Sequence, residues 1–250
     1  MGLNNLSLSG GEGGNFRTGV QPSVELNYYY PFNKSWSLRT GLNLAFGHAS
    51  FRGDSYEFSE QVTLHSTEMA NFEAIYHYFV PTFSEQYNYL QANIPVMAVW
   101  KNESIHASAG MKLGLPIFRS GSYRTQEVTY YTEFPEFGSA INETDEGVYS
   151  GTLPEREKRY SGRTYKMPVW VMLSAEVGYM FQQGVRRNVK SRISLYFDWS
   201  VTKCKTDSDN GFITPSNYYP TYHTFTNCMN SNMIEKYGLM TYGIKYSIKL

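Results

Sequence analysis

Long runs of two-residue alternation are the feature that most constrains the fold of this chain. In Trp36–Phe46 and Met167–Phe181, apolar side chains occupy almost every second position, and small or polar residues fill most of the positions between. Val189–Val201 and Tyr242–Leu250 repeat the pattern. Alternate side chains of a β-strand point to opposite faces. Each run therefore predicts a strand with one apolar and one polar face.

Four further segments alternate in the same way, which brings the number of candidate strands to eight. Several of the eight run for about 11 to 15 residues, whereas strands of ordinary globular proteins average about five or six. A tilted strand needs about 9 to 11 residues to cross a bilayer. Strand length therefore favours a membrane barrel. The four further segments are Leu3–Ser9, Val20–Tyr30, Tyr87–Trp100 and Ile105–Ile117.

The connections between these segments alternate between short and long. Pro31–Ser35, Lys101–Ser104 and Gln182–Asn188 are short polar turns, and Gly10–Gly19 is a Gly-rich link. The long connections are rich in Tyr, Ser, Thr, Glu and Asn and are expected to be irregular. They emerge at one end of the sheet, as extracellular loops of outer-membrane barrels do. The long connections are residues 51–84, 118–164 and 203–236.

Composition supports an all-β chain and excludes some functions. Aromatic residues make up 16% of the chain and charged residues only 18%, and aromatic side chains suit pleated surfaces. The net charge is zero, so no overall basic field attracts nucleic acid. No run approaches the roughly 18 to 20 apolar residues of a membrane helix. The mean hydropathy of −0.44 does not argue against a barrel, because only alternate residues of each strand face lipid.

The alternation also fits a soluble lipocalin-like barrel with an apolar interior, but three features favour apolar faces that meet lipid. The polar faces carry many small residues, which a narrow barrel interior requires. Their charges are sparse and of both signs, and aromatic residues gather near strand ends, as in membrane girdles. Buried ions need opposite partners, so we expect a lumenal charge network that plugs the barrel. Its expected members are Glu25, Arg39, Lys112, Glu176, Arg192, Asp198 and Lys245.

Four prolines fall inside the expected strands. Proline donates no backbone hydrogen bond, so it interrupts a ladder unless it lies at an edge or a bulge. We therefore expect bulges or broken pairs near Pro22, Pro95, Pro116 and Pro168.

Three segments resemble the outer-membrane β-barrel domain family of Bacteroidota, which is related in architecture to the OmpA and OmpX barrels. They are Tyr89–Val96, Ser108–Gly114 and the terminal Tyr242–Leu250, which ends in Leu where the family usually has Phe. The resemblance implies one domain over residues 1–250. It would be a transmembrane antiparallel up-and-down barrel of about eight strands, with long extracellular loops and short periplasmic turns, in the bacterial outer membrane. The family has no single activity to transfer.

Candidate catalytic and metal-binding residues are few. His106 and Ser108 share a strand face, but a nucleophile needs a base within hydrogen-bond reach and a third group to orient it. Their expected place beside a short turn favours lumenal packing. His65, His77 and His223 fall in the long connections without the spacing of a metal site. We therefore expect no catalytic residue, no metal and no cofactor.

The cysteines and the N-terminus bear on the compartment. Cys204 and Cys228 lie in the last long connection, where a single disulfide and two free thiols both remain open. An oxidising compartment favours the disulfide. The N-terminus lacks the basic and apolar regions of a signal peptide, so export requires a mature or truncated form.

By elimination, the expected function lies in the long connections, whose Tyr, Ser, Thr and Asn are typical of binding surfaces. We expect a non-enzymatic protein with a structural or interaction role, as a subunit or accessory of a larger outer-membrane uptake or secretion complex. Its partners would be outer-membrane lipid or lipopolysaccharide and other proteins. Two alternatives stay open. A lipid-modifying or proteolytic barrel enzyme requires a Ser/His/acid cluster at the lipid or loop face, and a transport channel requires a continuous water path.

Overall fold

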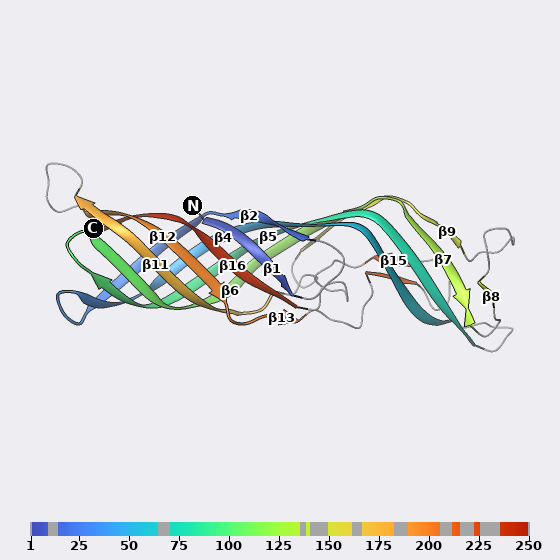
Figure 1. Cartoon of the computed structure of the whole chain (residues 1–250), viewed down its shortest axis with the longest axis horizontal. Coiled ribbons are helices and arrows are strands. Elements are labelled where there is room, and N and C mark those ends of the chain that lie inside the picture. Colours follow the sequence, from blue (N-terminus) through green and yellow to red (C-terminus); the bar gives the residue numbers. More distant parts are fainter. Residues whose placement is uncertain are drawn as a thin grey trace.

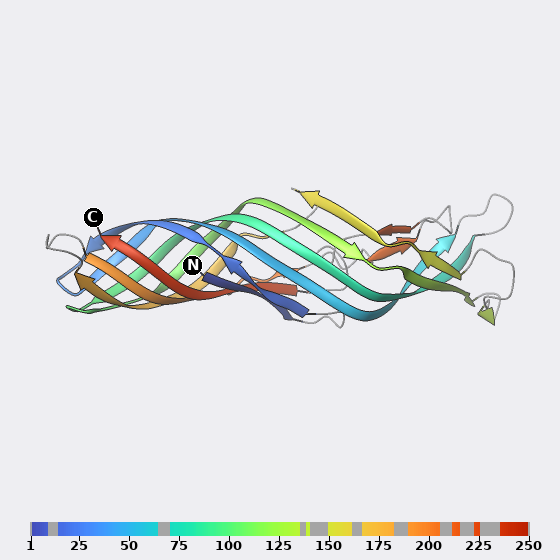
Figure 2. The ribbon, with the colours of Figure 1, turned by 90° about the horizontal axis from the view of Figure 1, so that it is seen from above.

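The structure is a computed structural model made almost entirely of antiparallel strands. Among the residues it describes, no helix is long and apolar enough to cross a membrane. The molecule is elongated, and its strands tilt across the long axis (Figure 1, Figure 2). The described residues are 2–9, 15–64, 71–135, 139–140, 150–161, 167–182, 190–205, 212–215, 223–225 and 236–249.

Each of the eight predicted segments overlaps a strand, although the main sheet has 14 strands. Pro22 separates two of them, because a proline cannot donate to the ladder. These two are β2 (Asn15–Gln21) and β3 (Ser23–Pro31). The other long strands are β1 (Gly2–Ser9), β4 (Trp36–Leu64), β5 (Phe72–Lys101), β6 (Ile105–Thr125), β11 (Trp170–Gln182), β12 (Lys190–Ser200) and β16 (Lys236–Lys249).

The paired strands follow one another around the long axis of the molecule. Successive neighbours are β6, β11, β12, β16, β1, β2, β4 and β5, and β5 pairs again with β6. Toward the short turns this circuit is interrupted. Within the described residues, β3 forms a ladder with β4, Ile244–Lys249 forms one with β12, and no ladder joins β3 to β16. The sheet is therefore not closed into a barrel. The predicted all-β antiparallel fold is confirmed, and the predicted barrel closure is not.

Two of the short turns lie within one residue of their predicted bounds, because Pro31 and Lys101 end strands. β3 ends at Pro31 and β4 begins at Trp36, and the side chain of Asn33 organises the turn by accepting hydrogen bonds from the amides of Ser35 and Trp36, at 2.9 and 2.8 Å. β5 ends at Lys101 and β6 begins at Ile105. Most of the third predicted turn lies outside the described residues.

The prediction of long irregular connections was wrong for much of their length. β4 and β5 run for 29 and 30 residues, so residues 51–64 and 72–84 are extended strand. Residues 118–164 and 203–236 contain the end of β6 and several shorter strands. These are β7 (Val128–Phe134), β8 (Ser139–Ala140), β9 (Ser150–Leu153), β10 (Arg156–Ser161), β13 (Cys204–Lys205), β14 (Ile213–Pro215) and β15 (His223–Phe225).

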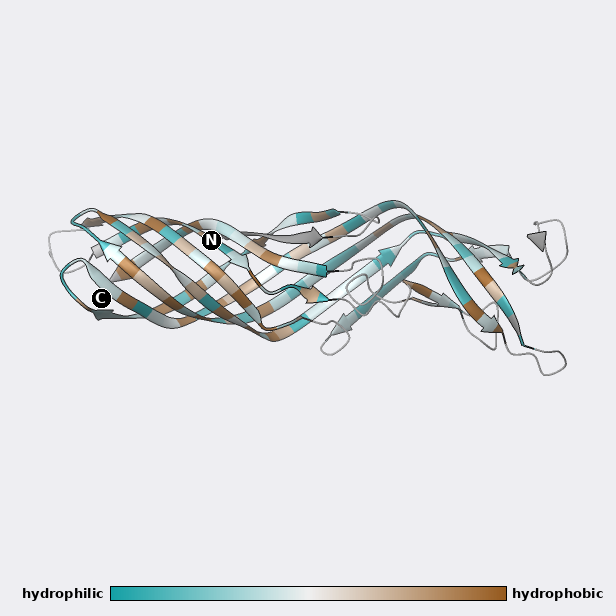
Figure 3. Ribbon diagram, turned by 60° about the horizontal axis from the view of Figure 1, so that its bottom comes forward, coloured by the Kyte–Doolittle hydropathy of each residue, from teal (hydrophilic) through white to brown (hydrophobic). Residues whose placement is uncertain are grey.

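In the proximal half of the molecule, next to the short turns, apolar side chains face outward and ionic ones inward. The proximal half comprises β3, β11, β12, residues 240–249 of β16, and residues 36–50, 88–101 and 105–118 of β4, β5 and β6. Leu44 and Leu195 are 42% and 60% exposed, whereas Arg39 and Glu176 are 0% and 4% exposed. Figure 3 shows apolar and polar segments alternating along these strands. This is the reverse of a water-soluble protein, and it has the sidedness that the alternation predicts.

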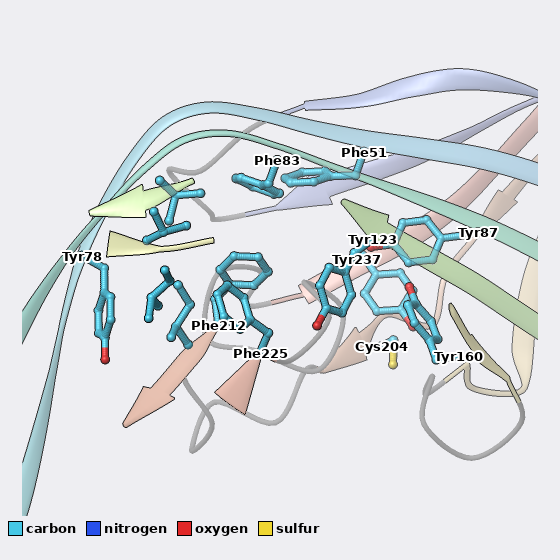
Figure 4. Packing of buried hydrophobic residues seen from close by; sticks show 14 of the residues in the cluster. Phe51, Tyr78, Phe83, Tyr87, Tyr123, Tyr160, Cys204, Phe212, Phe225 and Tyr237 are labelled. Atoms are coloured by element: carbon cyan, nitrogen blue, oxygen red, sulfur yellow. The ribbon is translucent and has the colours of Figure 1, made fainter. Parts of the chain in front are cut away.

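In the distal half, which comprises residues 51–64, 73–83, 120–135, 150–161, 212–215 and 223–225, the sidedness is reversed. Tyr76, Tyr78 and Phe83 are at most 2% exposed. The outer face is polar on β4 and mixed on β5, where Phe79 is 40% exposed on the same face as His77. The inward positions change from odd to even numbers near Ser55 and Pro81, where the β4–β5 ladder lacks one pair. Ser55 has a positive φ of 57°, and β4 and β5 arch there over β14 and β15 (Figure 1, Figure 4).

Candidate functional site

Glu176 of β11 is the centre of the ionic network inside the proximal half. Its carboxylate lies 2.8 Å from Arg39 Nη1, 3.0 Å from Lys245 Nζ and 3.3 Å from Arg192 Nη2. The four side chains are at most 13% exposed. They come from four different strands, β4, β11, β12 and β16, so the network ties distant parts of the sheet together across the interior.

A second ionic group lies beside the first. Lys112 Nζ lies 2.9 and 2.8 Å from the two carboxylate oxygens of Asp198. Ser174 donates to the same carboxylate at 2.5 Å, and Thr241 donates to it at 3.3 Å. Lys245 connects the interior to β3 through Glu25, with Nζ 2.5 Å from Oε2. All seven residues of the expected lumenal network thus take part in ion pairs within the interior.

Side chains leave little free space in this interior. A cavity of about 20 Å³ lies between Gln21, Asn43, Asn93, Lys112 and Asp198, which is room for about one water molecule. Glycines make the packing this close. A Cβ atom placed on Gly114 would lie 2.3 Å from Gln91 Nε2, so any larger residue there would displace a buried amide.

His106 and Ser108 point into the same interior but do not form a catalytic pair. They are 2% and 6% exposed. Neither His106 ring nitrogen nor the Ser108 hydroxyl has a hydrogen-bond partner among the described residues. The geometry matches polar residues packed in the interior of the sheet.

His223 of β15 lies among the aromatic side chains of the distal half, some of which Figure 4 shows. Its ring centroid is 5.6, 5.7 and 4.6 Å from those of Tyr76, Tyr78 and Tyr130, and its Nδ1 is 2.9 Å from Tyr78 Oη. Desolvation by burial, with a smaller effect from the charge of Arg156, lowers the pKa of His223 to about 4. Burial also raises the pKa of Tyr78. Both groups are therefore neutral at physiological pH, and the cluster is structural.

Ser59, His77 and Glu133 form a hydrogen-bonded row on the outer face of the distal half. Ser59 pairs with His77 across β4 and β5, and Ser59 Oγ lies 2.8 Å from His77 Nδ1. Glu133 Oε2 of β7 lies 3.3 Å from His77 Nε2. The His77 ring stacks on Tyr131 with centroids 4.5 Å apart. A hydroxyl, an imidazole and a carboxylate in this order are the groups of a nucleophilic triad.

The row of Ser59, His77 and Glu133 lies on an exposed face of the sheet, and this exposure limits the chemistry that it can support. Ser59 is exposed, and the side chains of His77 and Glu133 are 26% and 46% exposed. Acyl transfer also needs donors aimed at the developing oxyanion and a cleft that positions the substrate. The row by itself provides the nucleophile, the base and the orienting acid.

Other sequence candidates stay apart or lie outside the described residues. Glu73, which lies near His77 in the sequence, accepts a hydrogen bond from Gln61 at 3.0 Å. Among the described residues, no three His, Cys, Asp or Glu side chains gather as metal ligands. Cys204 is buried, but Cys228 and His65 lie outside the described residues, so the expectation of a disulfide stays a prediction.

The Ser59 row was missed by the sequence interpretation because its members are 18 and 56 positions apart and meet only through strand register. The available signal was the continued alternation of Tyr56, Phe58 and Val62 with polar residues, which marks residues 56–64 as a strand. No protein-family model, no curated protein and no solved structure matches this chain.

Proposed function

We propose that the chain is a bacterial outer-membrane protein that crosses the bilayer, mainly with its proximal half, as an up-and-down barrel built on the circuit of β6, β11, β12, β16, β1, β2, β4 and β5. The observation that carries this proposal is the reversal of sidedness along β4, β5 and β6. Hydrocarbon favours an apolar exterior around a paired polar interior, and water favours the opposite. The proximal half then lies in lipid, and the distal half projects into water at the end away from the short periplasmic turns.

The lumen in this proposal is plugged. An eight-stranded barrel has an interior barely wide enough for its own side chains. The ion pairs around Glu176 and Asp198 and the small adjoining cavity support a plug over a conducting channel. A buried network of ion pairs of this kind holds the strands together and fills the path that ions would take.

We assign the chain a structural or interaction role, as a subunit or accessory of a larger outer-membrane uptake or secretion complex. The bilayer lipid and lipopolysaccharide would surround the proximal half. The distal half would present its outer polar face to protein partners, on a scaffold that the buried aromatic cluster makes rigid. Loops and extensions supported in this way are where binding function concentrates in β proteins.

Detergent dependence and topology test this proposal. We expect the purified chain to be monodisperse in detergent and to aggregate when the detergent is removed. In intact cells, added trypsin should cut in the distal half, for example at Lys158, and leave the proximal strands intact. A chain that stays monodisperse in plain buffer, or that is cut at Lys190 from outside, would contradict the membrane location.

The Ser59, His77 and Glu133 row favours a second candidate, a hydrolytic outer-membrane enzyme acting at the loop face. A fluorophosphonate probe tests it, because such probes label serines that a neighbouring base activates. Activity predicts labelling that Ser59→Ala abolishes and that Ser50→Ala, on the same strand, leaves unchanged. Absence of labelling on intact cells over pH 6 to 9 would exclude this candidate and leave the interaction role.

A further inference from the structure

A cavity of about 440 Å³ lies in the distal half between β6, β10 and β15. It is lined by Tyr123 of β6, by residues 155–158 in and beside β10, and by residues 223–225 of β15. No member of the lumenal ion pairs or of the Ser59 row lines it. Cavities of about 300 to 1,000 Å³ hold small organic ligands in proteins, so this one is large enough to bind such a molecule.

Aromatic rings form the inner wall of the cavity. Tyr123, His223 and Phe225 are at most 8% exposed. The rings of Tyr123 and Phe225 lie with their centroids 6.5 Å apart and their planes inclined by 20° (Figure 4). Nε2 of His223 has no hydrogen-bond partner among the described residues, whereas most buried polar atoms are satisfied by protein, water or a bound group. The inner wall is therefore mainly apolar and contains one unsatisfied nitrogen.

Arg156 and Lys158 place two positive charges on the cavity side of β10. They pair with Thr125 and Tyr123 of β6, and paired residues lie on the same face of a sheet. Thr125 and Tyr123 are at most 4% exposed, so this is the inward face. Arg156 Cζ lies 4.9 Å from the centroid of the Phe225 ring. Arg156 and Lys158 are nevertheless exposed, because the cavity in front of them is open to solvent.

The two carboxylates at the margin of the cavity are associated with Arg124 on the other face of the sheet. Glu155 Oε1 accepts hydrogen bonds from Nε and Nη2 of Arg124 at 2.7 and 2.5 Å, and Glu157 is the residue paired with Arg124 in the ladder. Among the residues that the structure describes, no carboxylate forms an ion pair with Arg156 or Lys158. Two cations therefore face the cavity without a counter-ion.

Two unpaired cations on one strand face favour a ligand with two negative charges. Alternate residues of a strand lie about 6.5 to 7 Å apart, so the side chains of Arg156 and Lys158 can both reach one phosphate group. A phosphate monoester carries a charge of about −1.5 to −2 at pH 7, whereas a carboxylate carries one charge. A guanidinium also presents its donors in a fork that matches phosphate oxygens. The aromatic wall suits the organic part of such an ester.

We infer that this cavity binds the phosphate monoester of a small organic molecule, with Arg156 and Lys158 on the phosphate and the organic part beside Phe225 and Tyr123. This binding activity goes beyond the structural or interaction role proposed above. It does not depend on the membrane location, because every residue that lines the cavity lies in the distal half. A soluble ester and a lipid headgroup can both supply the phosphate, since they share this chemistry.

Isothermal titration calorimetry of the full chain in phosphate-free detergent micelles tests the inference, with glucose 6-phosphate as the ligand. Glucose and inorganic phosphate are the comparison ligands, because each lacks one part of the ester. We expect glucose 6-phosphate to bind at least about tenfold more tightly than either. No measurable binding of glucose 6-phosphate, or an equal affinity for glucose, would overturn the inference. An equal affinity for inorganic phosphate would overturn the role of the aromatic wall.

Single substitutions in β10 test which side chains hold the phosphate. Arg156→Gln and Lys158→Gln should each weaken the binding of glucose 6-phosphate at least about tenfold, because each removes a hydrogen bond to a charged group. The matched control is Arg159→Gln, which removes the same charge from the opposite face of the strand and should leave the affinity unchanged. Lys158 and Arg159 are both exposed, so neither change disturbs the core. Equal losses in Lys158→Gln and Arg159→Gln would overturn the site, because they would show only general attraction by positive charge.

Competition by lipopolysaccharide distinguishes the two sources of phosphate. Lipopolysaccharide dispersed in detergent carries phosphate monoesters, and it is added to the chain saturated with glucose 6-phosphate. Displacement of glucose 6-phosphate would assign the phosphate to a lipid headgroup, and retention of glucose 6-phosphate would assign it to a soluble ester. Both results support a phosphate site and differ only in the molecule that carries the phosphate.

Discussion

At the residue scale, the interior of the proximal half depends on a single carboxylate. Glu176 is the shared partner of Arg39, Arg192 and Lys245, and Lys245 has a second partner in Glu25. Three positively charged side chains share this one carboxylate, so the interior has no excess of negative charge. The ion pairs are therefore mutually dependent, and losing Glu176 leaves buried positive charge that the remaining carboxylates cannot neutralise.

We predict that Glu176→Gln destabilises the protein by about 3–5 kcal/mol, the cost of stranding buried charges. Urea unfolding in lipid vesicles measures this. The matched control is Glu155→Gln, because Glu155 pairs with Arg124 at 2.5 Å but both side chains are more than half exposed, where such pairs contribute about 0–1 kcal/mol. Equal effects of the two variants would show that the interior ion pairs do not hold the proximal half together.

We also predict that acid loosens the distal aromatic cluster through His223. Its pKa falls from 6.5 to about 4 on folding, so the unfolded chain binds a proton at a higher pH than the folded one. Stability is therefore fully present above pH 6.5 and is lost as the pH falls to about 4, by up to about 3 kcal/mol. Near-ultraviolet circular dichroism against temperature at several pH values should show this, and His223→Phe should remove the dependence.

The sequence predicted the inward ionic residues well and the distal site poorly. Arg39 and Glu176 were identifiable because each lies on the polar face of a strongly alternating segment. The alternation within that segment is enough to predict the face of the strand to which each side chain points. The partners of His223 and His77 depend on which strand lies beside which, and on register between segments far apart in the chain. Alternation within one segment predicts neither the neighbouring strand nor the register with it.

At the element scale, the prolines acted largely as expected. Pro22 separates β2 from β3, and a register shift occurs in β2 between Arg17 and Val20. Near Pro95 the β4–β5 ladder lacks the two pairs between Thr40 and Asn43. Beside Pro116 the β5–β6 register shifts by one residue. Pro168 differs, because β11 begins only at Trp170 and the proline precedes the strand.

Only about half of the long strands β4 and β5 was predicted. The reason is that their inward-facing positions switch between odd and even residue numbers partway along each strand. A search for one continuous alternation ends near Ser55, because the buried positions of β4 are odd-numbered before it and even-numbered after it. Beyond it Tyr56, Phe58 and Val62 occupy the new inward positions. The change coincides with a bend at Ser55, which has a positive φ and lies opposite a proline. A strict two-residue alternation in the sequence cannot predict such a bend.

Ser55 gives an element-scale prediction. A non-glycine residue in the left-handed region costs about 1–2 kcal/mol relative to its preferred conformations, and its φ is 57°. We expect Ser55→Gly to preserve or raise the stability of the distal half and Ser55→Val to lower it by about 1–2 kcal/mol. Ser50→Gly, in regular backbone of the same strand, should instead cost about 0.5–1 kcal/mol. Thermal unfolding followed by tyrosine circular dichroism distinguishes these outcomes, and a loss of stability in Ser55→Gly equal to that in Ser50→Gly would contradict a strained bend.

At the scale of the whole molecule, one continuous sheet has two opposite solvent preferences. The proximal half has apolar residues outside and ions inside, and the distal half has aromatics inside and polar residues outside. Average hydropathy is close to that of a soluble protein because the two halves and the two faces offset one another. The sidedness of each half, and not the overall composition, therefore indicates the environment.

Spin-label accessibility in lipid vesicles tests this central claim most directly. Nitroxides would be placed singly on outward positions, Leu113 and Leu195 in the proximal half and Glu57 and Tyr131 in the distal half, after Cys204 and Cys228 are changed to serine. Oxygen concentrates in hydrocarbon and a nickel chelate in water. We predict that the two proximal labels collide mainly with oxygen and the two distal labels mainly with the chelate. Proximal labels as accessible to the chelate as the distal ones would contradict the account.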